Sequence, residues 1–345
     1  MKRQALPLLF ALLCLVVSVS VEQPLAHQQK PQPIEEEADR PAGQTTIRVG
    51  VHQINVDVTV QNKKGKLIQG LKRGHFKVYE DKVEQEITNF APAEAPMTAV
   101  LVVEFSRYIN VVLGHYYGWE VIYEAWLASQ TFVRGMREGD WIAVIAYDLR
   151  PEMLVDFTDK QGEVLTALRR LNTPAYSESN LYDTVIDTLD QLEEVEGKVS
   201  IVLVTTGLDS FSKAHLGKLL KRVKNTNVTI YPIGLAGNFL ARREQNLPAT
   251  TRMDFHQAEA TLKNIAKSTG GQAYFPRFTT AFNGVFNEIS ALVRNQYSLS
   301  YVSSNPKQDN KFRKLRIQVE IDLDSDGKPD KLKVSHKQGY YPSTS

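Results

Sequence analysis

The sequence predicts a doubly wound, mostly parallel α/β sheet flanked by two β-sandwich-like segments. Between residues 97 and 294, continuous apolar runs alternate with stretches of helical periodicity, a pattern typical of parallel strands buried on both faces. On either side, residues 45–92 and 295–345 carry apolar residues at every second position, which is typical of half-buried strands. A chain of 345 residues has room for two domains at about 150 residues each.

Four apolar runs predict the central strands of the sheet, and shorter strands are expected at 153–157 and 272–275. The four runs are residues 99–103, 141–147, 199–204 and 228–233. Helices are expected at 119–136, 164–171, 181–192, 214–223, 258–267 and 281–294, and residues 238–257 are expected to form a loop because they have no clear period. In such sheets, ligands bind beyond the carboxyl ends of the strands, so the loops after Val103, before Leu181 and after Val204 are the candidate contact face.

The two flanks predict short antiparallel strands. They are expected at 47–60, 75–80 and 84–90 before the α/β region, and at 297–301, 314–322 and 331–335 after it. Each flank is too small to be expected to fold stably on its own. We therefore expect them to pack together as one β-sandwich with the α/β domain inserted between them. Two separate β units are the alternative.

The N-terminus predicts export. Lys2 and Arg3 precede the thirteen-residue apolar run Ala5–Val17, which is too short to cross a bilayer comfortably, and small residues follow at 18–20. Residues 1–20 are therefore expected to be a signal peptide, with an uncleaved anchor as the alternative. Residues 21–44 are polar and predict a flexible linker. We expect a periplasmic, cell-envelope or secreted protein with no membrane span in the mature chain.

Composition narrows the class of protein further. Hydrophobic residues make up 42% of the chain and charged residues 23%, an ordinary globular balance. Without residues 1–20, basic and acidic residues are equal in number, so the basic field that a nucleic-acid binder needs is missing. Cys14, the only cysteine, lies inside the predicted signal peptide, so the mature chain has no disulfide and no thiolate metal ligand.

Several segments resemble the von Willebrand factor type A family, and in particular the exported group seen in acidobacteria. Each segment is short, but their order and spacing extend over nearly the whole mature chain. They are LIQGLKRGHFKVYEDKVEQEI at 67–87, MREGDWIAVIAYD at 136–148, SNLYDTVIDTL at 179–189, IAKSTGGQAYFPR at 265–277 and QYSLSYVSSNP from 296. The resemblance implies a von Willebrand A-like domain over residues 97–294 that recognises proteins.

The family's metal-ion-dependent adhesion site is implied in a degenerate form. The family pattern is Asp-x-Ser-x-Ser after the first strand, a Thr on a second loop and an Asp on a third. Here Glu104 replaces the first Asp, Ser106 is retained, and Tyr108 replaces the second Ser. Ser179 stands at the Thr position and Thr206 at the second Asp position.

These departures weaken the case for magnesium. Magnesium prefers several oxygen ligands in near-octahedral geometry. The predicted site carries one carboxylate instead of two, and Arg107 adds a positive charge beside it. A metal-free domain that binds partners through its loop surface is therefore the favoured interpretation. Asp183 and Asp209 lie near the same rim in sequence and could substitute as ligands.

A second candidate metal site lies near the C-terminus. Asp322, Asp324, Asp326 and Asp330 surround Gly327 with a spacing that can converge on calcium, although Lys333 stands where an EF-hand has Glu. The alternative is a solvated hairpin turn, since Asp-Gly is a common turn dipeptide.

No motif supports catalysis. The seven histidines have no zinc-protease spacing, and the chain contains neither a phosphate-binding glycine loop nor a nucleophile elbow. We therefore expect an exported module that recognises a protein partner, with no certain cofactor and magnesium or calcium as candidates. An envelope enzyme whose active residues meet only in three dimensions, and a purely structural envelope protein, are the alternatives.

Overall fold

The structure is a computed structural model. It describes residues 53–93, 96, 98–108, 115–171, 178–195, 197–235, 237, 240, 245, 247–278, 280–323 and 327–342. The predicted signal peptide and linker lie outside the described residues. Within the described part of the chain, no helix is both long and apolar enough to span a membrane.

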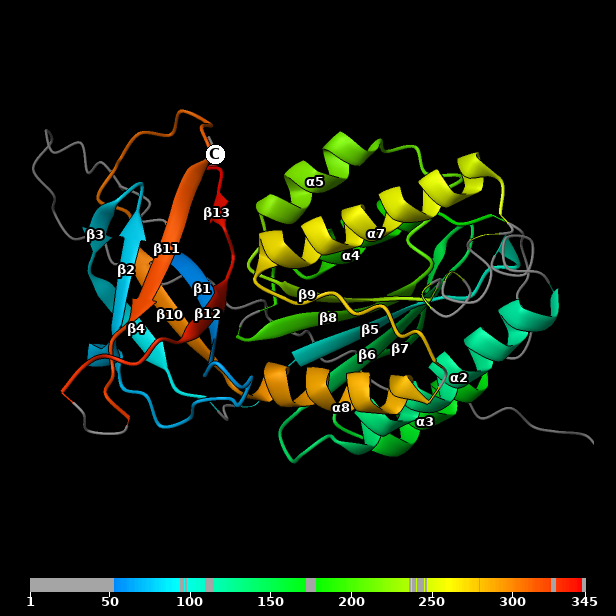
Figure 1. Ribbon diagram of the computed structural model, residues 1–345, viewed down its shortest axis with the longest axis horizontal. Helices are drawn as coiled ribbons and strands as arrows, with labels where there is room; N and C mark the ends of the chain where they lie inside the picture. The colour runs from blue at the N-terminus through cyan, green and yellow to red at the C-terminus, as the bar shows by residue number, and fades with distance from the viewer. Residues whose placement is uncertain are drawn as a thin grey trace, which may run out of the picture. The chain divides into compact units, whose positions relative to one another are not determined.

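A five-stranded sheet in the order β7-β6-β5-β8-β9 forms the centre of the α/β region (Figure 1). Its strands are β5 (Thr98–Glu104), β6 (Trp141–Tyr147), β7 (Pro151–Thr158), β8 (Val199–Thr205) and β9 (Thr229–Gly234). β6, β5, β8 and β9 run parallel, while the edge strand β7 pairs antiparallel with β6. The predicted α/β fold with a mostly parallel sheet is confirmed. The short strand expected at 272–275 is reduced to a single bridge between Ile233 and Tyr274.

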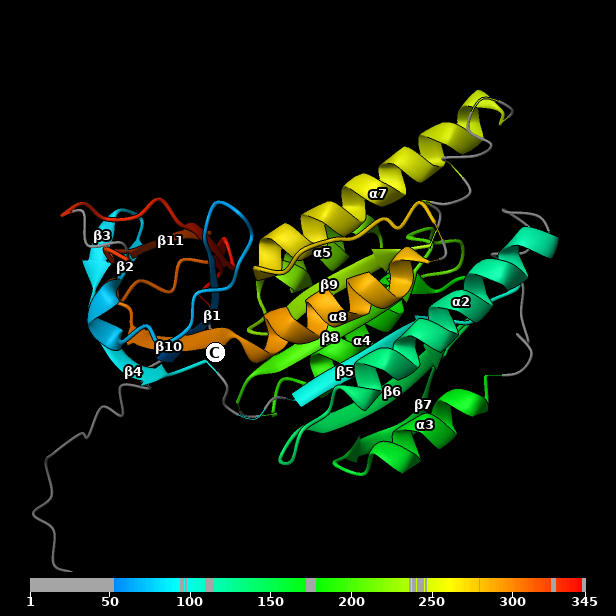
Figure 2. The ribbon, with the colours of Figure 1, turned by 60° about the horizontal axis from the view of Figure 1, so that its bottom comes forward.

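Successive side chains of the apolar strands point to opposite sides of the sheet, so both faces are apolar. Helices therefore cover both faces. Along β5, Ala99, Leu101 and Val103 belong to one buried cluster, and Val100 and Val102 to the other. Figures 1 and 2 show α2 (His115–Arg134), α3 (Gln161–Arg169) and α8 (Ala281–Arg294) on one face, and α4 (Leu181–Gln191), α5 (Leu216–Lys224) and α7 (Ala249–Thr269) on the other.

Helix α7 corrects one sequence prediction. Residues 249–257, expected within a loop, form its first turns. The sequence gives little sign of this because Phe255 is the only buried residue among them, so no apolar stripe develops before Ala258. The predicted end of the helix is right: Gly270 adopts φ 85°, and a Cβ there would lie 2.6 Å from the carbonyl carbon of His336.

The flanking segments form two four-stranded sheets, ordered β12-β1-β10-β4 and β13-β11-β2-β3. The strands are β1 (Gln53–Gln61), β2 (Phe76–Glu80), β3 (Val83–Gln85), β4 (Ile87–Ala91), β10 (Gln296–Val302), β11 (Arg313–Val319), β12 (Lys333–His336) and β13 (Gly339–Tyr340), with a 3-10 turn, η1 (Arg73–His75), before β2. β1 pairs with β10 and β12, and β2 pairs with β11, so both sheets combine strands from before and after the α/β region. Side chains from both sheets form one buried cluster.

A buried ion pair crosses the second of these sheets. Glu80 and Arg313 are both 3% exposed, and the Arg313 Nη1 donates to Glu80 Oε1 at 3.0 Å. The Tyr301 and Tyr340 hydroxyls donate to Glu80 Oε2 at 2.7 and 2.9 Å. Burial alone would raise the pKa of Glu80, but hydrogen bonds from Ser303, the two tyrosines and Arg313 outweigh it and lower the pKa.

The amino-terminal edge of the α/β sheet contacts the flanking strands where the chain passes from one region to the other. The Lys198 ammonium, just before β8, donates to the carbonyl oxygens of Gln296 at 2.7 Å and Pro92 at 3.2 Å. Lys337 Nζ donates to Asn227 Oδ1 at 2.7 Å, and Gln296 Nε2 donates to the Tyr231 hydroxyl at 3.0 Å. This junction leaves the opposite, carboxyl-terminal edge of the sheet clear of the flanks.

Glu80→Ala should lower the free energy of unfolding by about 3–5 kcal/mol, because it leaves a buried guanidinium and two buried hydroxyls without their acceptor. Urea unfolding measures this. The matched control is Glu320→Ala, which removes an exposed pair with Lys77 and should cost about 1 kcal/mol or less. Because the Glu80 pKa is lowered, its contribution is present at neutral pH and is lost as the pH falls below the usual glutamate pKa. Equal effects of the two substitutions would contradict this account.

Candidate functional site

The predicted adhesion-site residues meet at the carboxyl edge of the sheet. Glu104 ends β5, Ser106 follows it, Thr206 follows β8, and Ser179 precedes α4. β5 and β8 are neighbours in the sheet. After β5 the chain continues to β6 on one side, and after β8 it continues to β9 on the other side. Doubly wound folds have a crevice where the direction changes in this way. The sequence therefore placed these four residues at the correct edge.

The Glu104 carboxylate is the centre of this cluster and is 1% exposed. Its Oε2 accepts hydrogen bonds from the Thr206 N–H at 2.7 Å and from the Thr205 and Thr206 hydroxyls at 2.9 Å each. Its Oε1 accepts from the Ser106 hydroxyl at 3.1 Å. Burial raises the pKa of Glu104 even though these hydrogen bonds oppose the shift.

Tyr147, at the end of β6, extends the cluster. Its hydroxyl donates to Thr205 Oγ1 at 2.8 Å and lies 3.4 Å from Glu104 Oε2. Burial and the Glu104 charge raise the pKa of Tyr147 well above its ordinary value. Three neighbouring strands, β6, β5 and β8, are thus connected through one carboxylate and its hydroxyl donors.

Ser179 is held beside the cluster by its backbone. Its N–H donates to Ser210 Oγ at 2.9 Å, and its carbonyl accepts from the Ser210 N–H at 2.9 Å. The Ser179 hydroxyl itself is buried and has no hydrogen-bond partner among the described residues. The loops before α4 and after β8 are therefore fixed to each other by main-chain contacts.

The two nearby aspartates that could substitute as ligands already have other partners. Asp183 accepts from the backbone N–H groups of Lys213 and Ala214 at 2.8 and 2.9 Å. Asp209 accepts from the Tyr182 N–H at 3.0 Å and the Ser212 hydroxyl at 2.5 Å. Both carboxylates stabilise loop structure at the start of α4.

This arrangement does not fit a magnesium ion. Magnesium needs several oxygen lone pairs directed at one point, whereas here a backbone N–H and several hydroxyl donors are directed at a single carboxylate. Glu104, Ser106, Ser179 and Thr206 are each 2% exposed or less, so a partner's carboxylate could not complete a coordination shell. Within the described ranges, no group of three or more His, Cys, Asp or Glu side chains could hold a metal ion.

The C-terminal acidic turn is described only in part. Asp324 and Asp326 lie outside the described residues. Asp322 Oδ2 accepts from the Gly327 N–H, and Asp330 Oδ2 accepts from the Leu323 N–H, each at 2.8 Å. β11 and β12 belong to different sheets, but the Asp330 N–H donates to the Ile321 carbonyl oxygen at 2.8 Å. The solvated-turn alternative stays open. Calcium binding at this turn stays a prediction.

Several large apolar side chains stand exposed to solvent. Among the large hydrophobic side chains of the described residues, the three most exposed are Met253 at 70%, Phe278 at 62% and Phe211 at 58%. Met253 lies in the first turns of α7, Phe211 in the loop after β8 and Phe278 in the loop before α8. All three segments follow the carboxyl ends of strands or of the Tyr274 bridge (Figures 1 and 2). We call these three residues the apolar rim.

Sequence reasoning missed Tyr147 and Thr205. Tyr147 ends an apolar run and looks like one more core residue, while Thr205 adjoins the motif position Thr206. Their role depends on the side-by-side placement of β6, β5 and β8, which spacing along the chain does not reveal. A phenol at a strand's carboxyl end beside a predicted site was the only signal available.

Comparison with known proteins gives remote similarities. No family model matches the chain, and no curated protein matches it. Among solved structures, the chain is similar to the vWF domain of the type V pili tip protein Mfa5 from Porphyromonas gingivalis, with 15% identity over 58% of this chain and 95% of that one, TM-score 0.43. A von Willebrand factor type A protein from Catenulispora acidiphila has 10% identity over 84% and 74%, TM-score 0.43. An aerotolerance-related membrane protein from Bacteroides fragilis has 15% identity over 58% and 98%, TM-score 0.41.

Two of these structures carry the name of the family that the sequence resembles. Because all three TM-scores lie below 0.5, the likenesses are remote. The description of the fold rests on the strand order and connections given above. Membership of the acidobacterial exported group stays a prediction.

The double variant Glu104→Asp/Thr206→Asp should bind magnesium more tightly than the natural chain. The substitutions shorten the buried carboxylate, remove one of its hydroxyl donors and supply a second acid. Saturating Mg²⁺ should raise the Tm of the variant by about 3 °C and leave that of the natural chain unchanged. Glu104→Gln is the control and should not respond. A magnesium-dependent rise in the natural chain that Glu104→Gln abolishes would show that the native cluster binds the ion.

Proposed function

We propose that this protein is an exported protein-recognition module with a von Willebrand A-like domain. It binds its partner through the loops at the carboxyl edge of the α/β sheet, without a metal ion and without catalysis. The flanking sheets form a β-sandwich that supports the domain from its other edge, and residues 21–44 act as the linker to the N-terminus.

The apolar rim is the observation that carries this proposal. Exposed aromatic and methionine side chains cost free energy in a free protein and supply the anchors of protein interfaces. Met253, Phe278 and Phe211 belong to three separate segments, yet all three segments lie at one edge of the sheet. Their shared location favours one contact surface over three exposed side chains that have no common role.

The buried cluster around Glu104 supports the rim from beneath as a degenerate adhesion site. Its hydrogen bonds join the ends of β5, β6 and β8 and so fix the loop that carries Phe211. Catalysis at the cluster has no support, because a substrate could not reach side chains that are 2% exposed or less. The same inaccessibility argues against metal-bridged adhesion.

A photoreactive amino acid placed at Phe211 or Met253 should form a discrete covalent adduct with one envelope protein when irradiated in the source cells. The physical reason is that buried interface anchors lie in van der Waals contact with the partner. The matched control is Val83 on β3, which is 57% exposed but lies on a flanking sheet. Mass spectrometry of the adducts measures the result. Adducts at Val83 and none at the rim would contradict the proposal.

Export predicts that the mature protein begins after Ser20. Intact-mass analysis and N-terminal sequencing of the protein from the source cells should give Val21 as the first residue, because small residues at 18 and 20 suit signal peptidase. Replacing Ser18 and Ser20 with Lys should leave the precursor uncleaved. A mature chain that retains Lys2 and Arg3 in the cytoplasmic fraction would refute export.

A further inference from the structure

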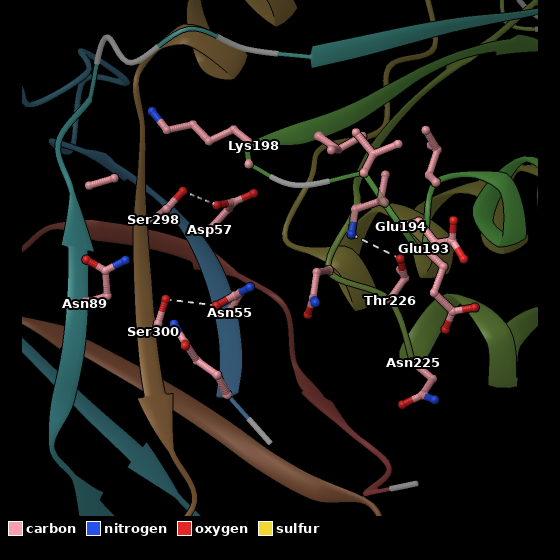
Figure 3. A pocket seen from close by; sticks show the side chains of 18 of the residues that line it. Asn55, Asp57, Asn89, Glu193, Glu194, Lys198, Asn225, Thr226, Ser298 and Ser300 are labelled. Atoms are coloured by element: carbon pink, nitrogen blue, oxygen red, sulfur yellow. Dashed lines mark hydrogen bonds between the residues drawn. The ribbon is translucent and has the colours of Figure 1, made fainter. Parts of the chain in front are cut away.

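A polar cavity of about 650 Å³ lies at the junction between the flanking strands and the amino-terminal edge of the α/β sheet (Figure 3). It is far in the fold from the carboxyl edge and plays no part in the proposed protein-binding face. Its volume falls within the range of about 300–1,000 Å³ typical of small-molecule sites.

One wall of the cavity is the face of three neighbouring strands, β4, β10 and β1. In the strand register, Asn89, Ser300 and Asn55 form one cross-strand row, and Ser298 and Asp57 lie in the next. Figure 3 shows these side chains projecting from the sheet face toward the α/β region. They form a polar platform on the face of the sheet, away from the free main-chain edge that would pair with a peptide strand.

The opposite wall comes from the loops that precede β8 and β9. It presents the carboxylates of Glu193 and Glu194, the amides of Asn225 and Asn227, and the Thr226 hydroxyl. The cavity thus combines these hydrogen-bonding groups with apolar side chains, among them Leu192, Val195 and Val228.

The charges in the cavity disfavour an anionic ligand. The Lys198 ammonium is occupied by the Gln296 and Pro92 carbonyl oxygens. Arg222 is occupied by Asp190, at 2.6 Å from its Nε, and by the Leu189 carbonyl oxygen at 2.8 Å from its Nη2. Glu193 Oε2 lies 3.8 Å from Arg222 Nη2. Asp57 and Glu194 are left as the cavity carboxylates with no ion pair among the described residues, and they would repel an anion.

The groups that stay available to a ligand are the NH₂ donors of the asparagine side chains and an acceptor oxygen of Asp57. Asn55, Asn89, Asn225 and Asn227 each accept a hydrogen bond at Oδ1, and none of their NH₂ groups has a partner among the described residues. Asp57 Oδ1 accepts from the Ser298 hydroxyl at 2.5 Å, and no other side chain of the described set donates to this carboxylate. The four asparagines are exposed, so water can reach their NH₂ groups. A ligand that accepts from several amides and donates to one carboxylate would match this arrangement.

We propose that this cavity binds a neutral, hydroxyl-rich ligand of the saccharide class. Each sugar hydroxyl both donates and accepts, so adjacent hydroxyls can satisfy an asparagine NH₂ and the Asp57 carboxylate together. The carboxylates would repel an anionic ligand. An ammonium group has no acceptor to offer, so it would leave the asparagine NH₂ donors without a ligand partner.

Asp57 supports this assignment because its charge is unfavourable in the free protein. Burial raises its pKa to about 6, against the opposing effects of Ser298, Lys198 and Lys337. Burial also lowers the pKa of Lys198, and it lowers that of Lys337 to about 8. Because the folded-state pKa of Asp57 is raised, ionisation of this group reduces stability as the pH rises from about 4 to above 6. Asp57→Asn should therefore leave the fold at least as stable at pH 7, while replacing one of the two acceptor oxygens with an NH₂ donor.

The test is a glycan array that carries neutral, acidic and amino oligosaccharides, probed with the purified, fluorescently labelled chain. Isothermal titration calorimetry with the strongest neutral glycan then compares three variants. Asp57→Asn and Asn55→Ala should each weaken binding about tenfold or more, since each removes a hydrogen bond to the ligand. The matched control is Asn264→Ala, an exposed asparagine on α7 outside the cavity, and it should bind like the natural chain.

Binding of neutral glycans that both cavity variants lose, with unchanged Tm, supports the proposal. Binding confined to acidic or amino glycans, no glycan binding at all, or neutral binding retained by Asp57→Asn overturns it. Because the apolar rim is intact in these variants, cross-linking from Phe211 should be unaffected, which separates this inference from the proposed protein recognition.

Discussion

The Glu104 carboxylate is the interaction on which the carboxyl edge of the α/β sheet depends. Its oxygens accept from Ser106, Thr205 and Thr206, and Tyr147 adds a contact from the neighbouring strand. A buried charge is tolerated only when such donors surround it. Glutamate is one methylene longer than the aspartate of the family pattern, and its carboxylate lies among the hydroxyl groups. The protein's own donors therefore satisfy oxygens that would otherwise face a cation. The edge is thereby closed and ordered.

The two edges of the sheet have different roles in this account. The amino-terminal edge is attached to the flanking strands through Lys198, Gln296 and Lys337, which hold the two regions together by buried hydrogen bonds. The carboxyl edge is left clear, and its loops carry exposed apolar side chains above a rigid polar cluster. Rigid support lowers the entropy cost of ordering a contact surface on binding. Exposed apolar side chains beside a hydrogen-bonded sheet edge are compatible with the proposed recognition role.

The sequence predicted those features of the fold that depend on residues close together in the chain. The buried strands and the αL glycine at 270 were predictable because apolar runs and Gly-Gly pairs report local structure. The placement of Glu104, Ser106 and Thr206 followed from the rule that parallel strands end at one edge. Ser179 precedes α4, and only the family resemblance predicted its place beside them. Three features depend on long-range packing, which sequence periodicity does not report. They are the contribution of Tyr147, the helical start of α7 at Ala249 and the exchange of strands between the flanks. The Asp57 cavity was invisible for the same reason, since its walls are distant in sequence.

Protein donors, and not a metal ion, are expected to satisfy the Glu104 carboxylate. The most direct measurement is a crystal structure of the natural chain grown with saturating Mn²⁺, with anomalous difference maps calculated at the manganese edge. The account predicts no anomalous peak near Glu104 and a carboxylate within hydrogen-bonding distance of the Thr206 N–H. A peak coordinated by Glu104, Ser106 and Ser179 would contradict it.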